Sequence, residues 1–339
     1  MEQTGDQAEV SVRTILPVLK TFPTNEIAII GCHALNIARR SCEYDLLVVS
    51  PDPIPEKLIK VGDVSARLIF RNEADVRQPD PELALTLASA IPLRDSSFLL
   101  AGAALDCRRA FVANSKRSME MHLASSLKSL ARVDELLSEK ETREADLSLL
   151  SAARDFAYAE LLTNGRVPCP SHLLGQMKAL PKRRPSSFKP WADAFGLELS
   201  SRVTCENRLE GLSVIYDAVR TSGVGAGAAP YFGRYREVEA FKVMETKAKE
   251  LLEMMQSAEC FAYLGQEAVQ SLFDLYLMHV SKLRKERDYS RVVRDLTVGS
   301  DRLISEEVVK SLGLVRSQEM IGSAATGLKS AVSSLAKRI

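Results

Sequence analysis

Residues 27–49 of the chain are IAIIGCHALNIARRSCEYDLLVV, and the expected fold follows from this stretch. It begins and ends in short aliphatic runs, Ile27–Ile30 and Asp45–Val49, which are typical of buried β-strands. The segment between them, His33–Arg40, contains no proline or glycine and favours a short helix. The stretch therefore predicts a strand, a glycine turn, a short helix and a second strand.

Two features of this stretch predict a binding site for phosphate and metal. Gly31 ends the first strand, where the missing Cβ lets the backbone approach a phosphate, and Cys32 opens a helix whose free N–H groups favour anions. Glu43 and Asp45 are separated by one residue, so on a β-strand their side chains point to the same face. Two neighbouring carboxylates offer the hard oxygen ligands that a divalent metal prefers.

The arrangement resembles the motif of the nucleotidyltransferase superfamily, which has the fold of DNA polymerase beta. That motif has an apolar strand ending in Gly-Ser or Gly-Gly, a short spacer, and two acids that flank an apolar residue. Gly31 and Cys32 stand at the first position of the motif, and Glu43 and Asp45 at the second. The resemblance implies that Gly31 and Cys32 hold a nucleoside triphosphate such as ATP, and that Glu43 and Asp45 are catalytic and hold Mg²⁺.

Departures from that motif bear on activity. Cys32 stands where serine is usual, so a hydroxyl donor becomes a weak S–H donor. Glu43 stands where aspartate is usual, which lengthens one ligand in a site where Mg²⁺ requires near-octahedral geometry. Many relatives carry a third acid on a later strand as the base toward the acceptor hydroxyl. Ser65 aligns best with that position, and Asp63, two residues earlier, is the candidate base.

Three functional hypotheses remain open from the sequence. The first is an enzyme that transfers a nucleoside monophosphate from a triphosphate to an unknown acceptor, using Mg²⁺. The alternative is a catalytically degenerate protein of the same fold that serves as a nucleotide-binding or protein-interaction module. It predicts that Arg67 pairs with Glu43 or Asp45, because a guanidinium can replace the charge of the metal. A third interpretation, a helical scaffold with an unrelated sheet, requires that strands 27–31 and 45–49 are not neighbours.

The rest of the chain predicts two domains. Residues 1–114 form an α/β, nucleotidyltransferase-like domain with a small mixed sheet, whose third strand, Ala66–Phe70, follows a loop or a hairpin. From about Ser115 the periodicity becomes helical, so residues 115–339 form an all-α domain. Its clearest helix is Glu144–Asn164, which ends at Asn164-Gly165. Further helical patterns cover residues 116–139, 170–180, 205–220, 237–255 and 267–287.

Composition limits the classes of protein to consider. With 46% hydrophobic and 26% charged residues, the 339-residue chain is expected to fold into globular domains. Lys and Arg number 45 against 44 Asp and Glu, so no overall charge attracts the protein to nucleic acid or anionic lipid. Six cysteines without a CxxC pair favour the reducing cytoplasm. The polar start lacks the features of a signal peptide, and no apolar stretch is long enough to cross a bilayer.

Two loops of the helical part bear on possible partners. Residues 182–189 contain two lysines and two arginines, which form either a solvated turn or a contact for an RNA acceptor. Residues 222–235 are rich in glycine but lack the signature of a P-loop, so a flexible connector is expected. The expected partners are a nucleoside triphosphate and an unknown acceptor, with no membrane; the degenerate alternative adds a protein partner.

Overall fold

The computed structural model describes residues 14–338, except for residues 16, 21–25, 52–55, 63, 182–186, 222–237 and 284–286. The chain divides into two compact units. The N-terminal unit comprises Met1–Ser118 and Ala226–Lys247, and the helical unit comprises Met119–Gly225 and Ala248–Ile339. The predicted boundary at residue 114 lies close to the first division. Residues 226–247, which we assigned to the helical domain, belong to the N-terminal unit.

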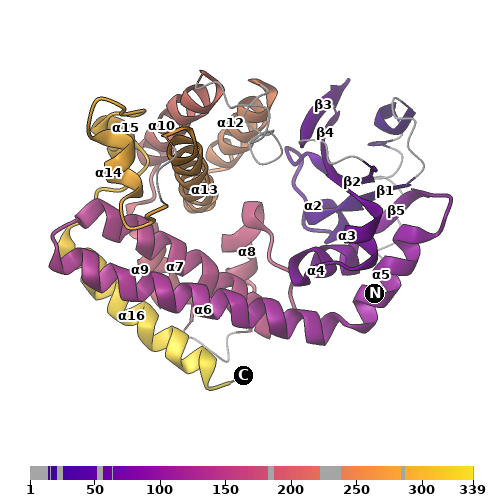
Figure 1. Ribbon diagram of the computed structural model, residues 1–339, viewed down its shortest axis with the longest axis horizontal. Coiled ribbons are helices and arrows are strands. Elements are labelled where there is room, and N and C mark those ends of the chain that lie inside the picture. The colour runs from indigo at the N-terminus through magenta and orange to yellow at the C-terminus, as the bar shows by residue number, and fades with distance from the viewer. Residues whose placement is uncertain are drawn as a thin grey trace. The chain divides into compact units, whose positions relative to one another are not determined.

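The described residues of the N-terminal unit contain a mixed sheet of five strands in the order β3-β4-β2-β1-β5 (Figure 1). Strands β2 and β4 run parallel, and the other neighbouring pairs are antiparallel. The small mixed sheet expected near the N-terminus is therefore present, with helices after it. The strands are β1 (Glu26–Ile30), β2 (Tyr44–Val49), β3 (Lys57–Val61), β4 (Val64–Arg71) and β5 (Ile91–Asp95).

Strands β3 and β5 were not expected from the sequence. Strand β3 forms a hairpin with β4 around Gly62, whose φ of 61° suits glycine, so the hairpin and not the loop precedes the third predicted strand. Strand β5 contains Pro92 and pairs only along its β1 side, at the edge of the sheet. Proline is tolerated at such an edge because no second neighbour needs its missing N–H.

Both faces of the sheet are covered. One face packs Ala28, Ile30 and Leu47 against three helices (Figure 1): α3 (Glu73–Arg77), α4 (Pro81–Ser89) and α5 (Leu99–Arg109). The other face packs Ile27, Ile29, Leu46 and Val48 against Ile15, Val18 and Leu19, which belong to a helical segment near the start of the described chain. This alternation along β1 and β2 is the period of two that a buried strand requires.

The short helix between β1 and β2 differs from the prediction. The sequence favoured a helix over His33–Arg40, whereas α2 is Gly31–Ala34. Asn36 adopts a left-handed conformation with φ of 57°, which ends the helix, and asparagine tolerates this conformation better than most residues. Residues 35–43 then reach β2 through hydrogen-bonded turns, so Arg39 and Arg40 lie outside any helix.

The helical unit matches most of the predicted helices. The clearest prediction, Glu144–Asn164, is α7 (Thr142–Thr163), which ends at Asn164 and at Gly165 with φ of 70°. Within the predicted loop 180–191, α9 (Phe188–Phe195) begins, and residues 182–186 and the loop 222–235 lie outside the described residues. The other helices are α6 (Phe111–Ser138), which begins in the N-terminal unit, α8 (Leu173–Lys178), α10 (Arg202–Thr221), α12 (Val238–Glu253), which begins in the N-terminal unit, α13 (Ser257–Leu283), α14 (Val292–Thr297), α15 (Glu306–Ser311) and α16 (Gln318–Ala336).

Among the residues that the structure describes, no helix has the length and the apolar character that a membrane span needs.

Candidate functional site

The predicted motif residues meet where β1 ends and β2 begins. Ile30, the last residue of β1, lies opposite Asp45 in the antiparallel pair of β1 and β2. Asp45 in turn lies beside Arg67 in the parallel pair of β2 and β4. Gly31 follows Ile30 directly and has a φ of 68°. Adjacent strands therefore bring the glycine turn and the acidic residues together, which excludes the interpretation in which strands 27–31 and 45–49 are apart.

The missing Cβ of Gly31 makes room for the carboxylate of Asp45. A Cβ at Gly31 would lie 3.3 Å from Cγ of Asp45 and closer still to Oδ2, a contact that real Cβ atoms do not make. The close approach of the Asp45 side chain therefore requires a residue without a Cβ at this position. The role of Gly31 in binding phosphate stays a prediction.

We expect Gly31→Ala to destabilise the N-terminal unit by about 1–3 kcal/mol, because the left-handed backbone and the Asp45 contact both oppose a Cβ. Gly62→Ala is the matched control, since Gly62 has a similar φ of 61° but no atom within 4 Å of a built Cβ. Urea denaturation should show a larger loss for Gly31→Ala than for Gly62→Ala. Equal losses in the two variants would contradict the role of Asp45.

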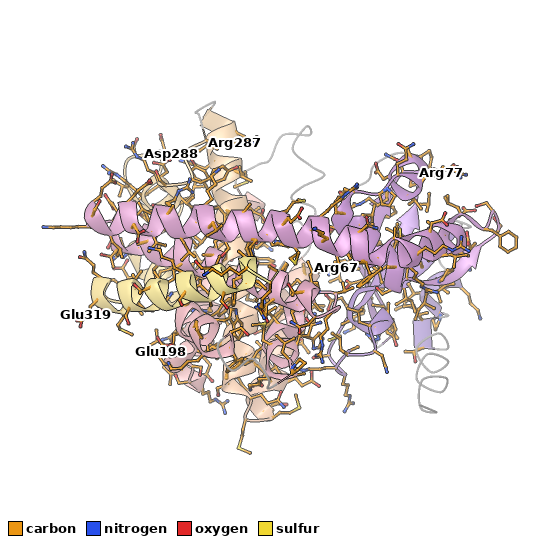
Figure 2. The ribbon with its side chains drawn as sticks, turned by 90° about the horizontal axis from the view of Figure 1, so that it is seen from below. Arg67, Arg77, Glu198, Arg287, Asp288 and Glu319 are labelled. Atoms are coloured by element: carbon orange, nitrogen blue, oxygen red, sulfur yellow. The ribbon has the colours of Figure 1, made fainter. Side chains whose placement is uncertain are left out.

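Two basic side chains of the N-terminal unit neutralise the acidic pair. Arg67, labelled in Figure 2, donates from Nε to Oδ1 of Asp45 at 2.8 Å, and its Nη2 lies 3.9 Å from Oε1 of Glu43. Lys247, from the part of α12 that belongs to this unit, forms an ion pair with Oε2 of Glu43. The side chains of Glu43 and Asp45 are 11% and 13% exposed, and that of Lys247 is 7% exposed. Two positive charges therefore balance two largely buried negative charges.

The pKa values reflect this neutralisation. Burial opposes ionisation of Glu43, but the charges of Lys247 and Arg67 outweigh burial and lower its pKa to about 2. The carboxylate of Asp45 raises the pKa of Arg67 above its usual value. Glu43 and Arg67 are accordingly both charged at neutral pH, and each acid of the pair has a basic side chain as its partner.

The residues next to the motif are mostly buried. Cys32, the implied phosphate ligand, is 5% exposed. The ring of His33 stacks on Tyr44 with 3.8 Å between the centroids, and its Nε2 lies 3.2 Å from the carbonyl oxygen of Cys42. Burial lowers the pKa of His33. Cys32 and His33 are therefore part of the packing around the turn.

Two further residues bear on the site. One was predicted but lies outside the described residues, and the other is part of the site but was not predicted from the sequence. Asp63, the candidate base, lies outside the described residues, between the ends of β3 and β4. Lys247 was missed because nothing near it in the sequence connects it with Glu43. Only its burial in an otherwise amphipathic helix is unusual for a lysine, and burial is not visible in a sequence.

The arrangement does not fit Mg²⁺. Carboxylate oxygens are suitable ligands for this ion, but a metal must displace a side-chain cation from each of Glu43 and Asp45. The cations are covalently part of the protein and lie within contact distance of the acids.

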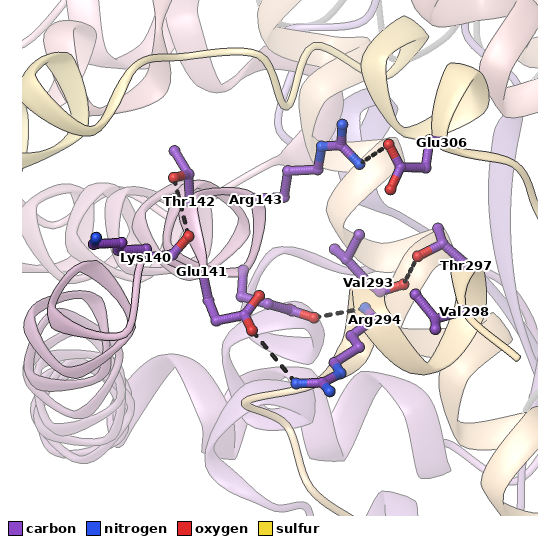
Figure 3. A pocket seen from close by; sticks show the side chains of 10 residues that line it. Lys140, Glu141, Thr142, Arg143, Val293, Arg294, Thr297, Val298 and Glu306 are labelled. Carbon is purple, nitrogen blue, oxygen red and sulfur yellow. Dashed lines mark hydrogen bonds and ion pairs between the residues drawn. The ribbon is translucent and has the colours of Figure 1, made fainter.

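The helical unit contains a pocket of about 470 Å³ where the start of α7 faces α14 (Figure 3). The charged side chains that line it form ion pairs with one another. Nη1 of Arg143 lies 2.7 Å from Oε2 of Glu306, and Nη1 of Arg294 lies 3.4 Å from Oε1 of Glu141. The buried carboxylate of Glu144 accepts the backbone N–H of Arg294 at 2.8 Å, and burial raises its pKa to about 8. Glu144 thereby supports the start of α14. The pocket contains none of the residues predicted for the nucleotide site.

Comparison with known proteins gives a distant likeness to solved structures only. No protein-family model and no curated protein sequence matches the chain. Among solved structures, a nucleotidyltransferase-like protein from Exiguobacterium sibiricum aligns with 82% of this chain and 81% of its own, at 13% sequence identity and a TM-score of 0.34. At this identity and score the likeness is too weak to assign the chain to a family.

Proposed function

We propose that this protein is a catalytically degenerate relative of the nucleotidyltransferases, which keeps the fold and does not turn over nucleotides. The observation behind the proposal is the set of ion pairs that the two acids form with basic side chains of the protein. Both acids that would bind Mg²⁺ are instead neutralised by Arg67 and Lys247. The carboxylate of Asp45 also lies directly against Gly31, where a Cβ would otherwise be.

A nucleoside triphosphate is bound and activated through a metal that neutralises its phosphates and aligns the reacting oxygens. Here the side chains of Arg67 and Lys247 supply the positive charge. That charge neutralises the two acids instead of the phosphates of a ligand. A guanidinium and an ammonium hold the acidic pair without a metal, so the fold keeps the shape of the site and loses its chemistry.

Calorimetry and a turnover assay test this proposal. Titrating the protein with ATP and Mg²⁺ should give no Mg²⁺-dependent binding heat, and incubation with nucleoside triphosphates should release no pyrophosphate. Asp45→Ala should leave both results unchanged. Turnover by the wild-type protein that is lost in Asp45→Ala would overturn the proposal in favour of the enzyme.

Arg67→Met provides a positive control for the exchange of cation and metal. Without the guanidinium, the carboxylate of Asp45 becomes available to Mg²⁺, so millimolar Mg²⁺ should raise the unfolding temperature of Arg67→Met. The wild-type protein should show no such shift. A Mg²⁺-induced shift that is equal in both proteins would show that Arg67 does not take the place of a metal.

A further inference from the structure

We propose that Cys32 and Cys42 are a redox-active pair, an oxidation site that reacts with a small-molecule disulfide such as oxidised glutathione. Their Sγ atoms lie within 4.8 Å of one another, and both residues are reduced and buried. The two cysteines bracket the segment that joins Gly31 to Glu43. This inference concerns thiol chemistry and does not depend on the proposed function.

The local backbone permits the sulfur atoms to meet. The sulfurs of a disulfide are about 2.05 Å apart, so oxidation must draw the two thiols closer. Between them, residues 35–41 form turns and irregular backbone, and neither cysteine belongs to a strand of the sheet. The segment can therefore take up the movement without breaking the pairing of β1 and β2.

The surroundings of the two sulfurs assign an order to the reaction. Cys42 Sγ accepts a hydrogen bond from the backbone N–H of Arg39 at 3.3 Å, so a donor already faces this sulfur. Cys42 is also the more exposed of the two, at 9% against 5% for Cys32. Cys42 is accordingly the attacking residue and Cys32 the resolving residue.

The chemistry balances with one molecule of oxidised glutathione. The thiolate of Cys42 attacks one glutathione sulfur, which forms a mixed disulfide and releases the first glutathione as a thiolate. The sulfur of Cys32 then loses its proton and attacks the Cys42 sulfur, which breaks the mixed disulfide and releases the second glutathione. The protein loses two electrons and two protons, and glutathione disulfide becomes two glutathione thiols. In a reducing compartment such a bridge is transient and reports redox state.

Another pair of cysteines and one single cysteine serve as internal comparisons. In the helical unit, Cys205 and Cys260 are fully buried in α10 and α13, and their thiols share a hydrogen bond that lowers the pKa of Cys205 and raises that of Cys260. In the N-terminal unit, Cys107 is buried in α5, and burial raises its pKa. Cys107 is the matched control because it shares the unit and the burial of the pair but lies outside the bracketed segment.

The test is disulfide mapping of the full chain under native conditions. The protein is incubated in buffers with a rising ratio of oxidised to reduced glutathione, alkylated and digested, and its peptides are identified by mass. We expect a peptide that links Cys32 to Cys42 in the wild-type protein and in Cys107→Ala. Cys32→Ala should stop at a mixed disulfide of glutathione on Cys42. In Cys42→Ala, glutathione should modify Cys32 about tenfold more slowly.

Several outcomes would overturn the inference. These are a wild-type protein that remains folded by circular dichroism without a link between Cys32 and Cys42, a link confined to Cys205 and Cys260, and a link that disappears in Cys107→Ala. Equal rates at Cys32 and Cys42 in the single variants would overturn the assigned order. Because the wild-type mapping needs no substitution, it decides the question even if a variant fails to fold.

Discussion

Replacing Lys247 by methionine should destabilise the N-terminal unit by about 3–5 kcal/mol, because Glu43 would remain charged and largely buried without its closest cation. The side chains of Lys247 and Glu43 are 7% and 11% exposed, so water cannot replace the lost partner. The second variant, Glu43→Gln with Lys247→Met, removes both charges and should recover much of the loss. Urea denaturation of the single and double variants measures both effects.

The same ion pair predicts how stability depends on pH. The pKa of Glu43 is about 2 in the folded protein against 4.5 as its ordinary value. A lowered carboxyl pKa contributes stability that is fully present above pH 4.5 and is lost as the pH falls toward 2. The contribution of this group is about 3 kcal/mol. The double variant should lack this acid-dependent part of the stability.

A matched control separates burial from charge. Lys189→Met also removes a lysine from an ion pair, but Lys189 and its partner Asp193 are 78% and 46% exposed. Its effect should be at most about 0.5 kcal/mol. A Lys247→Met variant no less stable than Lys189→Met, or a double variant as unstable as Lys247→Met alone, would show that the pair does not hold the site together.

In the helical unit, Asp146→Asn should cost about 3–5 kcal/mol, because it leaves the guanidinium of Arg316 charged and buried. The side chains of Arg316 and Asp146 are 2% and 1% exposed. Asp146 Oδ1 accepts from Nε and Nη2 of Arg316 at 2.8 and 2.5 Å, and Nη1 donates to the carbonyl oxygen of Asp193 at 2.9 Å. The carboxylate thus joins α7 to the segment before α16.

Thermal and urea unfolding of three variants test the buried pair. Asp146→Leu combined with Arg316→Met replaces both charges by apolar groups and should be more stable than Asp146→Asn. Asp134→Asn is the exposed control, since Asp134 and its partner Lys329 are 60% and 37% exposed, and it should change stability by at most about 0.5 kcal/mol. Similar losses for Asp146→Asn and Asp134→Asn would contradict the importance of burial.

Local patterns predicted the parts of the fold that depend on neighbours in the sequence. Short aliphatic runs identified β1, β2 and β4, and the three-to-four spacing of apolar residues identified α7 together with its end at Asn164. Strand β5 was not predicted from the sequence; it contains Pro92, which a sheet tolerates only at an edge, and the edge position of β5 is a property of the tertiary structure. The predicted extent of the helix between β1 and β2 was wrong, because the conformation of Asn36 depends on the turn that leads into β2.

By itself, the sequence determined that a glycine turn and two acids stand at the junction of two strands, since strand period and turn chemistry are local properties. The sequence also predicted that Arg67 pairs with one of the two acids. The alternation of side chains along β4 determines the face of the sheet to which this arginine points. Only the tertiary structure decided the balance of charge. Lys247 reaches Glu43 from a helix distant in sequence, and Asp45 fills the space over Gly31. Both contacts depend on how separate elements pack. Local sequence patterns do not predict contacts between residues that are far apart in the chain.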